Sequence, residues 1–219
     1  MKYTIPHTCQ IANLSELYEK YFGELNTGTF VDVGAHDGIS FSNVRGLAEA
    51  GWSGICFEPL PELFEKLLTL YVENDNVLAF DYCIGDYDGE IDLYLGENPT
   101  IDLETVEKQP WGSSYDKNKS IKRICKRLDT ALALYLSPKF EVLSIDVEGA
   151  ELQVLRGFSI EYWLPKMIII ETHDGNPDSR KSFHAQAIND YFASKPYVRI
   201  QCDGLNTIFV QEQVYALHT

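Results

Sequence analysis

Five stretches of the sequence end an apolar run and continue with glycines or acidic side chains. The first, FVDVGAHDGISFSNV at 30–44, sets Asp32 among apolar residues and then carries Gly34 and Gly38. Gly34 allows a tight turn, and Gly38 lets a helix begin close to the strand, with free amides that can face an anionic group. The glycines lack the dinucleotide spacing G-x-G-x-x-G, and the acid precedes them. This arrangement favours a cofactor with a cationic amino-acid part, although the stretch alone also fits an ordinary strand-to-helix turn.

The next two stretches carry groups that fit a nucleoside. In CFEPLPEL, Glu58 lies about 20 residues beyond the glycine loop, where an acid accepts hydrogen bonds from both ribose hydroxyls in this architecture. A solvated surface glutamate is the alternative, but that would be unusual between an apolar run and Pro59. In FDYCIGD, Asp81 and the backbone after it can face an adenine edge, while Gly85 and Asp86 predict a turn.

An acidic motif, SIDVEGAEL at 144–152, follows a fourth apolar run. Asp146 stands at the tip of the expected strand, and Glu148 and Glu151 lie three residues apart at the start of a helix. Carboxylates at a helix start are stabilised by the helix dipole, so capping is an alternative role for the two glutamates. Capping does not account for Asp146, which is therefore a candidate for chemistry.

A fifth run, IIIETHD at 168–174, brings out Glu171, His173 and Asp174. A lone histidine is more often structural than catalytic, but His173 stands beside two acids where the mouth of a cleft is expected. In a doubly wound sheet, ligands bind beyond the carboxyl ends of the strands, at the point where strand order reverses. The five stretches therefore predict one shared site.

The elements that position these stretches alternate along the chain. Apolar runs of strand length recur at 29–33, 54–57, 77–84, 141–145, 167–170, 197–201 and 207–210, and helical stretches lie at 43–52, 61–71, 127–136 and 150–158. The alternation predicts an α/β fold with a doubly wound, mostly parallel sheet, because parallel neighbours need crossover helices. Only CDGLN separates the last two runs, so they are expected to form a C-terminal antiparallel hairpin.

The length and composition predict a single domain over 1–219, because 219 residues with 45% hydrophobic side chains can bury one substantial core. A lead-in helix is expected over 13–23, capped by Asn13 or Ser15 and stopped by Gly23. The segment 96–123 is polar and punctuated by proline and glycine. We expect it to form a flap inserted over the site.

Charge and cysteine content restrict the partners and the compartment. A formal charge of -15, from 18 basic and 33 acidic side chains, repels phosphate backbones, so nucleic acid is not an expected partner. Five scattered cysteines show no metal or redox spacing and indicate a reducing compartment. The first ten residues lack the apolar core of a signal peptide, and the run 167–170 is far shorter than the roughly 20 residues of a membrane span. A cytoplasmic protein without a membrane span is expected, and the sequence indicates no oligomeric state.

The chain resembles the FkbM-type S-adenosylmethionine-dependent methyltransferases. The matching pieces are FVDVGAHDGISFSN, GICFEPLPELFEKL, LSIDVEGAELQVLRGF and KMIIIETHD, in this order, and together they cover about 28–211. DVEGAE followed by L-x-G is the more specific part. The resemblance implies a Rossmann-like sheet of the class I methyltransferase kind and S-adenosyl-L-methionine as cofactor. It also implies O-methylation of a hydroxyl on a sugar, glycan or other small polar metabolite.

The resemblance further implies roles for individual residues. Asp32, Gly34 and Gly38 would hold the methionine end of the cofactor, Glu58 the ribose, and Asp81 with Cys83 the adenine, while Ala35, His36 and Pro59 complete the cofactor site. Trp111, Ser113 and Ser114 of WGSS, together with Glu148, would lie near the substrate. The chain departs from the family pattern at His36 and Asp37, where asparagine followed by an apolar residue is commoner. The segment 96–123 is also less alike, so the resemblance does not extend to the identity of the acceptor.

Methyl transfer is an in-line displacement, so the protein must align the acceptor oxygen and remove its proton. His173 is the first candidate for the general base, with Glu171 or Asp174 orienting its ring, and Asp146 is the alternate. In a further alternative, Asp146, Glu148 and Glu171 converge on a magnesium-like divalent metal that lowers the pKa of the acceptor hydroxyl.

Two other functions fit parts of the pattern. An NAD(P)-dependent oxidoreductase would use Glu58 for its ribose equally well, but the third glycine of the dinucleotide spacing is missing. A non-catalytic nucleotide- or sugar-binding module would keep the same pocket, and the acids after the fourth and fifth runs would also suit passive sugar recognition. Titration with S-adenosylmethionine and with NAD, combined with a test for methyl transfer, separates the three.

Overall fold

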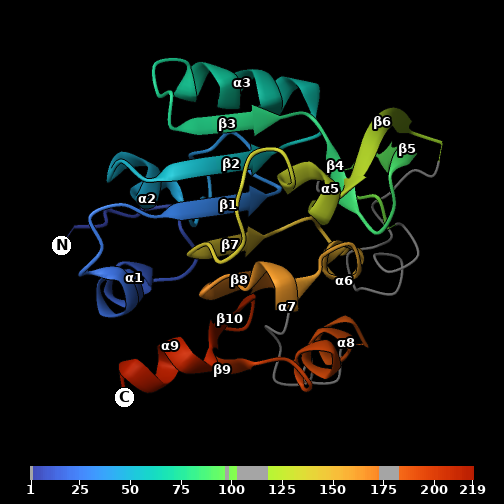
Figure 1. Ribbon diagram of the computed structural model, residues 1–219. Helices are drawn as coiled ribbons and strands as arrows, with labels where there is room; N and C mark the ends of the chain where they lie inside the picture. Colours follow the sequence, from blue (N-terminus) through green and yellow to red (C-terminus); the bar gives the residue numbers. More distant parts are fainter. Residues whose placement is uncertain (1, 97–98, 103–117, 173–182) are drawn as a thin grey trace.

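The computed structural model of the chain describes residues 2–96, 99–102, 118–172 and 183–219. Its main element in these ranges is a seven-stranded sheet with the order β3-β2-β1-β7-β8-β10-β9 (Figure 1). In chain order the strands are β1 Thr29–Val33, β2 Ser53–Phe57, β3 Val77–Phe80, β7 Val142–Ile145, β8 Met167–Glu171, β9 Tyr197–Cys202 and β10 Asn206–Gln211. The first five pair in parallel, whereas β10 is antiparallel to both β8 and β9. The expected α/β fold with a C-terminal antiparallel hairpin is therefore confirmed.

Helices cover both faces of this sheet. One layer contains α1 Leu14–Phe22, α2 Arg45–Glu49 and α3 Pro61–Tyr71, and the other contains α5 Leu128–Leu132, α6 Glu151–Arg156, α7 Ile160–Trp163 and α8 Phe183–Phe192. Alternate residues of a strand face opposite layers, so in β1 Phe30 packs with the first layer and Val31 with the second. None of the helices within the described ranges has the length and apolar character that crossing a membrane requires.

The helices match the sequence expectation where the apolar periodicity is regular. The helix α1 lies within the expected 13–23, and α3 has the expected bounds. The stretch 43–52 gives the shorter α2, because the Ser42 hydroxyl accepts the amide of Arg45 at 3.1 Å and Gly51, at φ 84°, ends the turn. The helices α7, α8 and α9 Glu212–Leu217 were not expected.

A second sheet, with the order β4-β6-β5, lies beyond the carboxyl ends of the parallel strands (Figure 1). Its strands are β4 Cys83–Gly85, β5 Gly89–Tyr94 and β6 Ser120–Arg127. The run 77–84, expected as one strand, is therefore divided, because β3 pairs with β2 whereas β4 pairs with β6. Residues 120–123 of the expected flap belong to β6, and 103–117 lie outside the described residues.

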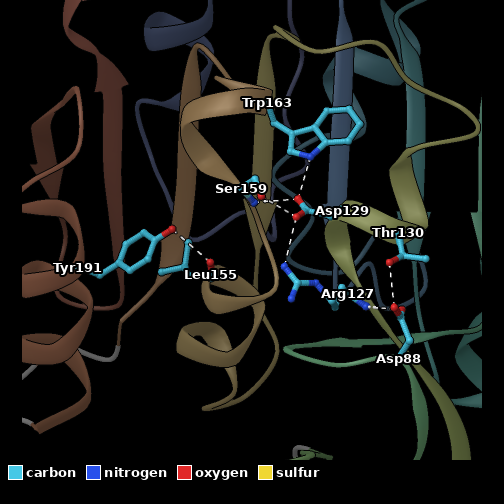
Figure 2. Close-up of polar contacts among 8 residues, drawn as sticks. All are labelled: Asp88, Arg127, Asp129, Thr130, Leu155, Ser159, Trp163 and Tyr191. Atoms are coloured by element: carbon cyan, nitrogen blue, oxygen red, sulfur yellow. Dashed lines mark hydrogen bonds and ion pairs between the residues drawn. The ribbon is translucent and has the colours of Figure 1, made fainter.

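Polar contacts join this second sheet to the helices next to it, as Figure 2 shows. The carboxylate of Asp129 on α5 accepts hydrogen bonds from the amide and hydroxyl of Ser159 at 2.8 and 2.7 Å and from the indole of Trp163 at 2.8 Å. Asp129 also accepts a hydrogen bond of 3.3 Å from the guanidinium of Arg127 on β6, and Asp88, just before β5, accepts one of 2.9 Å from the hydroxyl of Thr130 on α5. Burial alone would raise the pKa of Asp129, but these hydrogen bonds outweigh it and lower that pKa. The second sheet is thus fixed against the main body of the fold.

Candidate functional site

A cleft of about 400 Å³ opens beyond the carboxyl ends of β1, β2 and β7. It lies where the strand order reverses, because the chain continues from β1 to β2 on one side and β7 lies on the other. Its volume is within the range of roughly 300–1,000 Å³ that is usual for small-molecule sites. Of the sequence-predicted residues, those that line it are Asp32, Gly34, Ala35, His36, Glu58, Pro59, Cys83, Asp146 and Glu148.

The two glycines of the first loop serve different purposes. Gly34 has φ 87° and lines the cleft, and a Cβ added there would lie 1.7 Å from the carbonyl oxygen of Asp146. Gly38 has φ 74° and is buried, and a Cβ there would meet Leu70 and Leu67 of α3 at 2.6 and 2.8 Å. Gly34 therefore allows β1 and β7 to approach at the site. Gly38 lets the loop pack under α3 and is not among the residues that line the cleft.

His36 and Asp37, where the sequence departs from the family pattern, have different roles in the first loop. The Asp37 carboxylate accepts the backbone amides of Ile39 and Ser40 at 2.9 and 2.7 Å and the hydroxyl of Ser40 at 2.9 Å. Burial would raise the pKa of Asp37, but these hydrogen bonds outweigh it and lower the pKa to about 2. His36, at φ 54°, lines the cleft with a side chain that is 46% exposed. Asp37 thus closes the loop, while His36 faces the ligand space.

Glu58 connects the first two predicted loops. Its carboxylate accepts the backbone amide of His36 at 2.9 Å and that of Leu60 at 2.8 Å, and the side chain is buried. Burial raises its pKa although both hydrogen bonds oppose the shift. Each carboxylate oxygen has a second lone pair, so these bonds leave acceptor capacity toward the cleft. The acid expected to meet the ribose therefore also holds the glycine loop in place.

A small polar group lies beneath the loop and was not predicted. Asp32 is buried and hydrogen-bonded to Ser144 of β7, whose hydroxyl also accepts the side-chain amide of Asn43 at 3.3 Å. Burial raises the pKa of Asp32 to about 7, with a smaller contribution from the charges of Asp146 and Glu58. Asn43 and Ser144 both line the cleft. The only signal in the sequence was position: Asn43 directly follows the first loop, and Ser144 lies one residue before the end of β7.

Three carboxyl groups gather at the carboxyl ends of β7 and β8. Each of Asp146, Glu148 and Glu171 offers an oxygen within 4.8 Å of the others. Asp146 and Glu171 lie close enough that the charge of Asp146 disfavours ionisation of Glu171. Burial and the charge of Glu151 raise the pKa of Asp146 to about 6, and burial with the charge of Asp146 raises that of Glu171 well above its usual range. The group can exchange a proton or hold a divalent cation.

Of the two residues predicted to meet the adenine, only Cys83 is among those that line the cleft. Cys83 lines the cleft, and burial raises its pKa to about 12. Asp81 is not among the described residues that line it; its carboxylate forms an ion pair of 2.6 Å with Arg123 of β6, and its side chain is 49% exposed. Between them Tyr82 lines the cleft, a position that the sequence analysis did not single out. His173, Trp111, Ser113 and Ser114 lie outside the described residues.

Comparison with known families gives a match over most of the chain. Residues 32–199 match the family model described as the methyltransferase FkbM domain. The matched range begins at Asp32 and includes Glu58, the acids after β7 and β8, and the second sheet. A comparison with curated proteins gives no match.

Several solved structures resemble this chain in fold but share little of its sequence. The methyltransferase domain of METTL16 superposes with a TM-score of 0.51 at 11% identity, over 95% of this chain and 72% of that one. Monomeric WbdD gives a TM-score of 0.50 at 14% identity, over 92% of this chain and 41% of that one. Fibrillarin from Aeropyrum pernix, in complex with natively bound S-adenosyl-L-methionine, gives 0.45 at 12% identity, over 84% and 65%. At these identities the likeness to METTL16 and WbdD shows the fold alone.

Proposed function

This chain belongs to the FkbM methyltransferase domain family and is an S-adenosylmethionine-dependent methyltransferase, and we propose that it methylates a hydroxyl oxygen of a sugar, glycan or other small polar metabolite. The observation that carries the proposal is the position of Asp146 and Glu148 in the same cleft as the loops after β1 and β2. Carboxylates accept hydrogen bonds from hydroxyl groups and can take up a proton from one of them.

The described residues of the cleft fit S-adenosyl-L-methionine. Glu58 lies directly after β2, where the ribose binds in this architecture. Asp32, near the end of β1, and the loop with His36 that follows β1 lie where we place the methionine part. Neither lysine nor arginine is among the described residues that line the cleft. That charge pattern suits a cationic cofactor better than the pyrophosphate of a dinucleotide. When bound, the cofactor supplies a methyl group on a sulfonium, which an acceptor oxygen can attack in line.

We assign removal of the acceptor proton to Asp146 and Glu171, at the carboxyl ends of β7 and β8. Asp146 lines the cleft beside the buried Glu171, and burial raises the pKa of both carboxyls, with the charge of Asp146 adding to the shift at Glu171. A base whose pKa lies near 6 is matched to proton transfer at neutral pH better than an ordinary carboxylate. His173 follows Glu171 by two residues and stays the other predicted base.

The charge of the chain supports an uncharged acceptor of modest size. The formal charge is -15, and the cleft itself carries the carboxyl groups of Asp32, Glu58, Asp146 and Glu148. A phosphorylated acceptor would meet repulsion on approach and find no cation on the described walls. We therefore do not expect nucleic acid to be a partner. A cytoplasmic location stays a prediction.

A divalent metal is a second way to activate the acceptor at the same place. Asp146, Glu148 and Glu171 would hold the ion, because carboxylate oxygens are the preferred ligands of magnesium and calcium and these three lie within 4.8 Å of one another. An ion there would lower the pKa of a bound hydroxyl. If activity persists after exhaustive treatment with a chelator, this alternative is excluded.

Labelled-methyl transfer tests the proposal directly. Purified full chain is incubated with S-adenosylmethionine carrying a labelled methyl and with a panel of free sugars, oligosaccharides and small polyols, and calorimetry measures binding of S-adenosylmethionine and of NAD. We expect S-adenosylmethionine to bind, NAD not to bind, and label to appear as an O-methyl ether. Label found only on nitrogen or on nucleic acid would contradict the hydroxyl assignment, and binding of NAD alone would contradict the function.

A further inference from the structure

The carboxylate of Glu151, the first residue of α6, holds together two parts of the chain. Its Oε1 atom accepts the backbone amides of Val147 at 3.0 Å and Gly149 at 3.2 Å. Its Oε2 atom lies 2.6 Å from Nε2 of His184 on α8. Glu151 is 0% exposed and His184 is 3% exposed. One buried carboxylate therefore fixes the loop after β7 and anchors it to a helix from a later part of the chain.

The loop that Glu151 fixes has an unfavourable backbone. Glu148 has φ 55° and Gly149 has φ 97°, so two consecutive residues are in the left-handed region, and Glu148 lacks the freedom of glycine there. The backbone amides of Val147 and Gly149, which donate hydrogen bonds to Glu151, lie on either side of Glu148 in the sequence. This turn is what directs the segment from Asp146 to Glu148 along the wall of the cleft. Such backbone strain persists where the surroundings hold it in place.

The charges of Glu151 and His184 support each other. Burial would raise the pKa of Glu151, but the hydrogen bond and charge of His184, with the backbone amides, lower it. Burial would likewise lower the pKa of His184, but the hydrogen bond and charge of Glu151 outweigh that effect and raise the pKa. Asp102 also faces the histidine, and Asp146 and Glu171 face the glutamate. Removing one partner of a buried pair leaves the other charge uncompensated, so the contact depends on both residues.

We propose that Glu151 and His184 are positioning residues for methyl transfer, which hold the turn at 146–149 so that Asp146 and Glu148 face the acceptor. The inference rests on the proposed function in one respect, namely that the acceptor binds next to Asp146 and Glu148. A misplacement of about 1 Å far from the reacting atoms can cost on the order of 100-fold in rate. Because the predicted cofactor loops follow β1 and β2, loss of this pair should lower kcat and leave cofactor affinity nearly unchanged.

The test compares two variants of the full chain. His184→Phe keeps a planar ring but removes the group that faces Oε2 of Glu151, whereas His184→Gln keeps an N–H donor at a similar reach. Amide hydrogen exchange at Val147 and Gly149 is compared with exchange at Leu143 of β7, which reports global opening. In His184→Phe we expect exchange at the two loop amides to rise about tenfold relative to β7, in line with one lost buried contact.

The functional readouts are kcat, measured with any acceptor that the panel identifies, and the dissociation constant of S-adenosylmethionine. We expect kcat to fall about 100-fold in His184→Phe, with the dissociation constant within about threefold of the wild type, and His184→Gln to restore most of the loss. Unchanged loop exchange in His184→Phe would overturn the inference. A dissociation constant that rises in proportion to the loss of kcat would overturn it as well.

A second pair of variants covers the case in which His184→Phe does not fold. Glu151→Gln keeps an oxygen acceptor for the two amides, whereas Glu151→Met has a similar length and no such acceptor. We expect only the methionine variant to lose protection at Val147 and Gly149, and equal exchange in the two would overturn the inference. If the wild type methylates no member of the panel, the hydroxyl-acceptor proposal fails, while the exchange comparison still decides whether the pair holds the loop.

Discussion

The backbone amide of His36 donates a 2.9 Å hydrogen bond to Oε2 of Glu58 and so joins the loop after β1 to the end of β2. The other oxygen of the same carboxylate accepts the amide of Leu60, at the entry to α3. Two segments that we assign to different parts of one cofactor are thus positioned by a single buried side chain. A change at Glu58 therefore affects both segments at once.

Replacing Glu58 by alanine should weaken cofactor binding strongly. The change removes an acceptor for the ribose and leaves the amides of His36 and Leu60 without their partner, and hydrogen bonds to charged groups contribute about 1.5–3 kcal/mol each. We expect the dissociation constant of S-adenosylmethionine to rise by at least about tenfold, as measured by calorimetry. Glu62→Ala is the matched control, because Glu62 lines the same cleft and is exposed. Equal effects of the two changes would contradict the assignment.

Gly34→Ala should be far more damaging than the same change at Gly51. Both glycines have a positive φ, 87° and 84°, so alanine pays about 1–2 kcal/mol for its backbone conformation at either position. At Gly51 a Cβ meets nothing within 4 Å, whereas at Gly34 it lies 1.7 Å from the carbonyl oxygen of Asp146. Urea unfolding should show a free-energy loss near that backbone cost for Gly51→Ala and about 3 kcal/mol or more for Gly34→Ala. A similar loss for both would show that β1 and β7 separate easily at this point.

Asp37 should stabilise the fold in a pH-dependent way. Its pKa is about 2 in the folded chain, below the value near 3.9 of an unfolded aspartate, so its stabilisation is fully present above the unfolded pKa. It is lost as the pH falls through the folded pKa. We expect Asp37→Ala to lower the free energy of unfolding by about 1 kcal/mol at pH 7, as for other side chains that cap backbone amides. Denaturant titrations at several pH values should show this difference shrinking toward pH 2, and a constant difference would contradict the assignment.

Asp146→Asn should abolish most of the methyl transfer without loss of the cofactor. Asparagine has nearly the same shape but cannot take up a proton, and general-base contributions are typically 10²–10⁴-fold. We expect kcat to fall by at least about 100-fold, with the dissociation constant of S-adenosylmethionine changed by less than about threefold. Asp92→Asn, on β5 in an exposed ion pair with Lys122, is the control and should behave like the wild type. A retained kcat in Asp146→Asn would assign the proton to another group.

The sequence was sufficient for the sheet and for the loops at its carboxyl end. The strands β1, β2, β7 and β8 are continuous buried runs, and the residues after them come to one edge because parallel strands end on the same side. Asp32 and Glu58 are therefore brought into one cleft by topology, as expected. Local signals of this kind depend on short segments and do not require knowledge of distant contacts.

The second sheet and the buried pair of Glu151 and His184 could not be predicted from the sequence in this way. The strand β6 is rich in charge, and its pattern is meaningful only once Lys122 and Arg123 meet Asp92 and Asp81 from other segments. His184 stands in a polar stretch of the sequence, and its partner precedes it by 33 residues. These contacts depend on long-range packing, so the sequence offered no signal that would separate His184 from an ordinary surface histidine.

The division of the fold into two sheets has a consequence for how the cleft can change in evolution. Leu93, Pro99 and Ile101 form part of the cleft wall, and they belong to β5 and the chain after it, outside the seven-stranded sheet. The excursion at residues 86–124 lies between β4 and the end of β6 in the sequence, and its described strands pair as β5 with β6 and β6 with β4, apart from the seven-stranded sheet. An insertion, deletion or exchange in this excursion would reshape one wall while the seven main strands keep their register. A different hairpin can therefore be accommodated beside Cys83 while the loops after β1 and β2 stay in place.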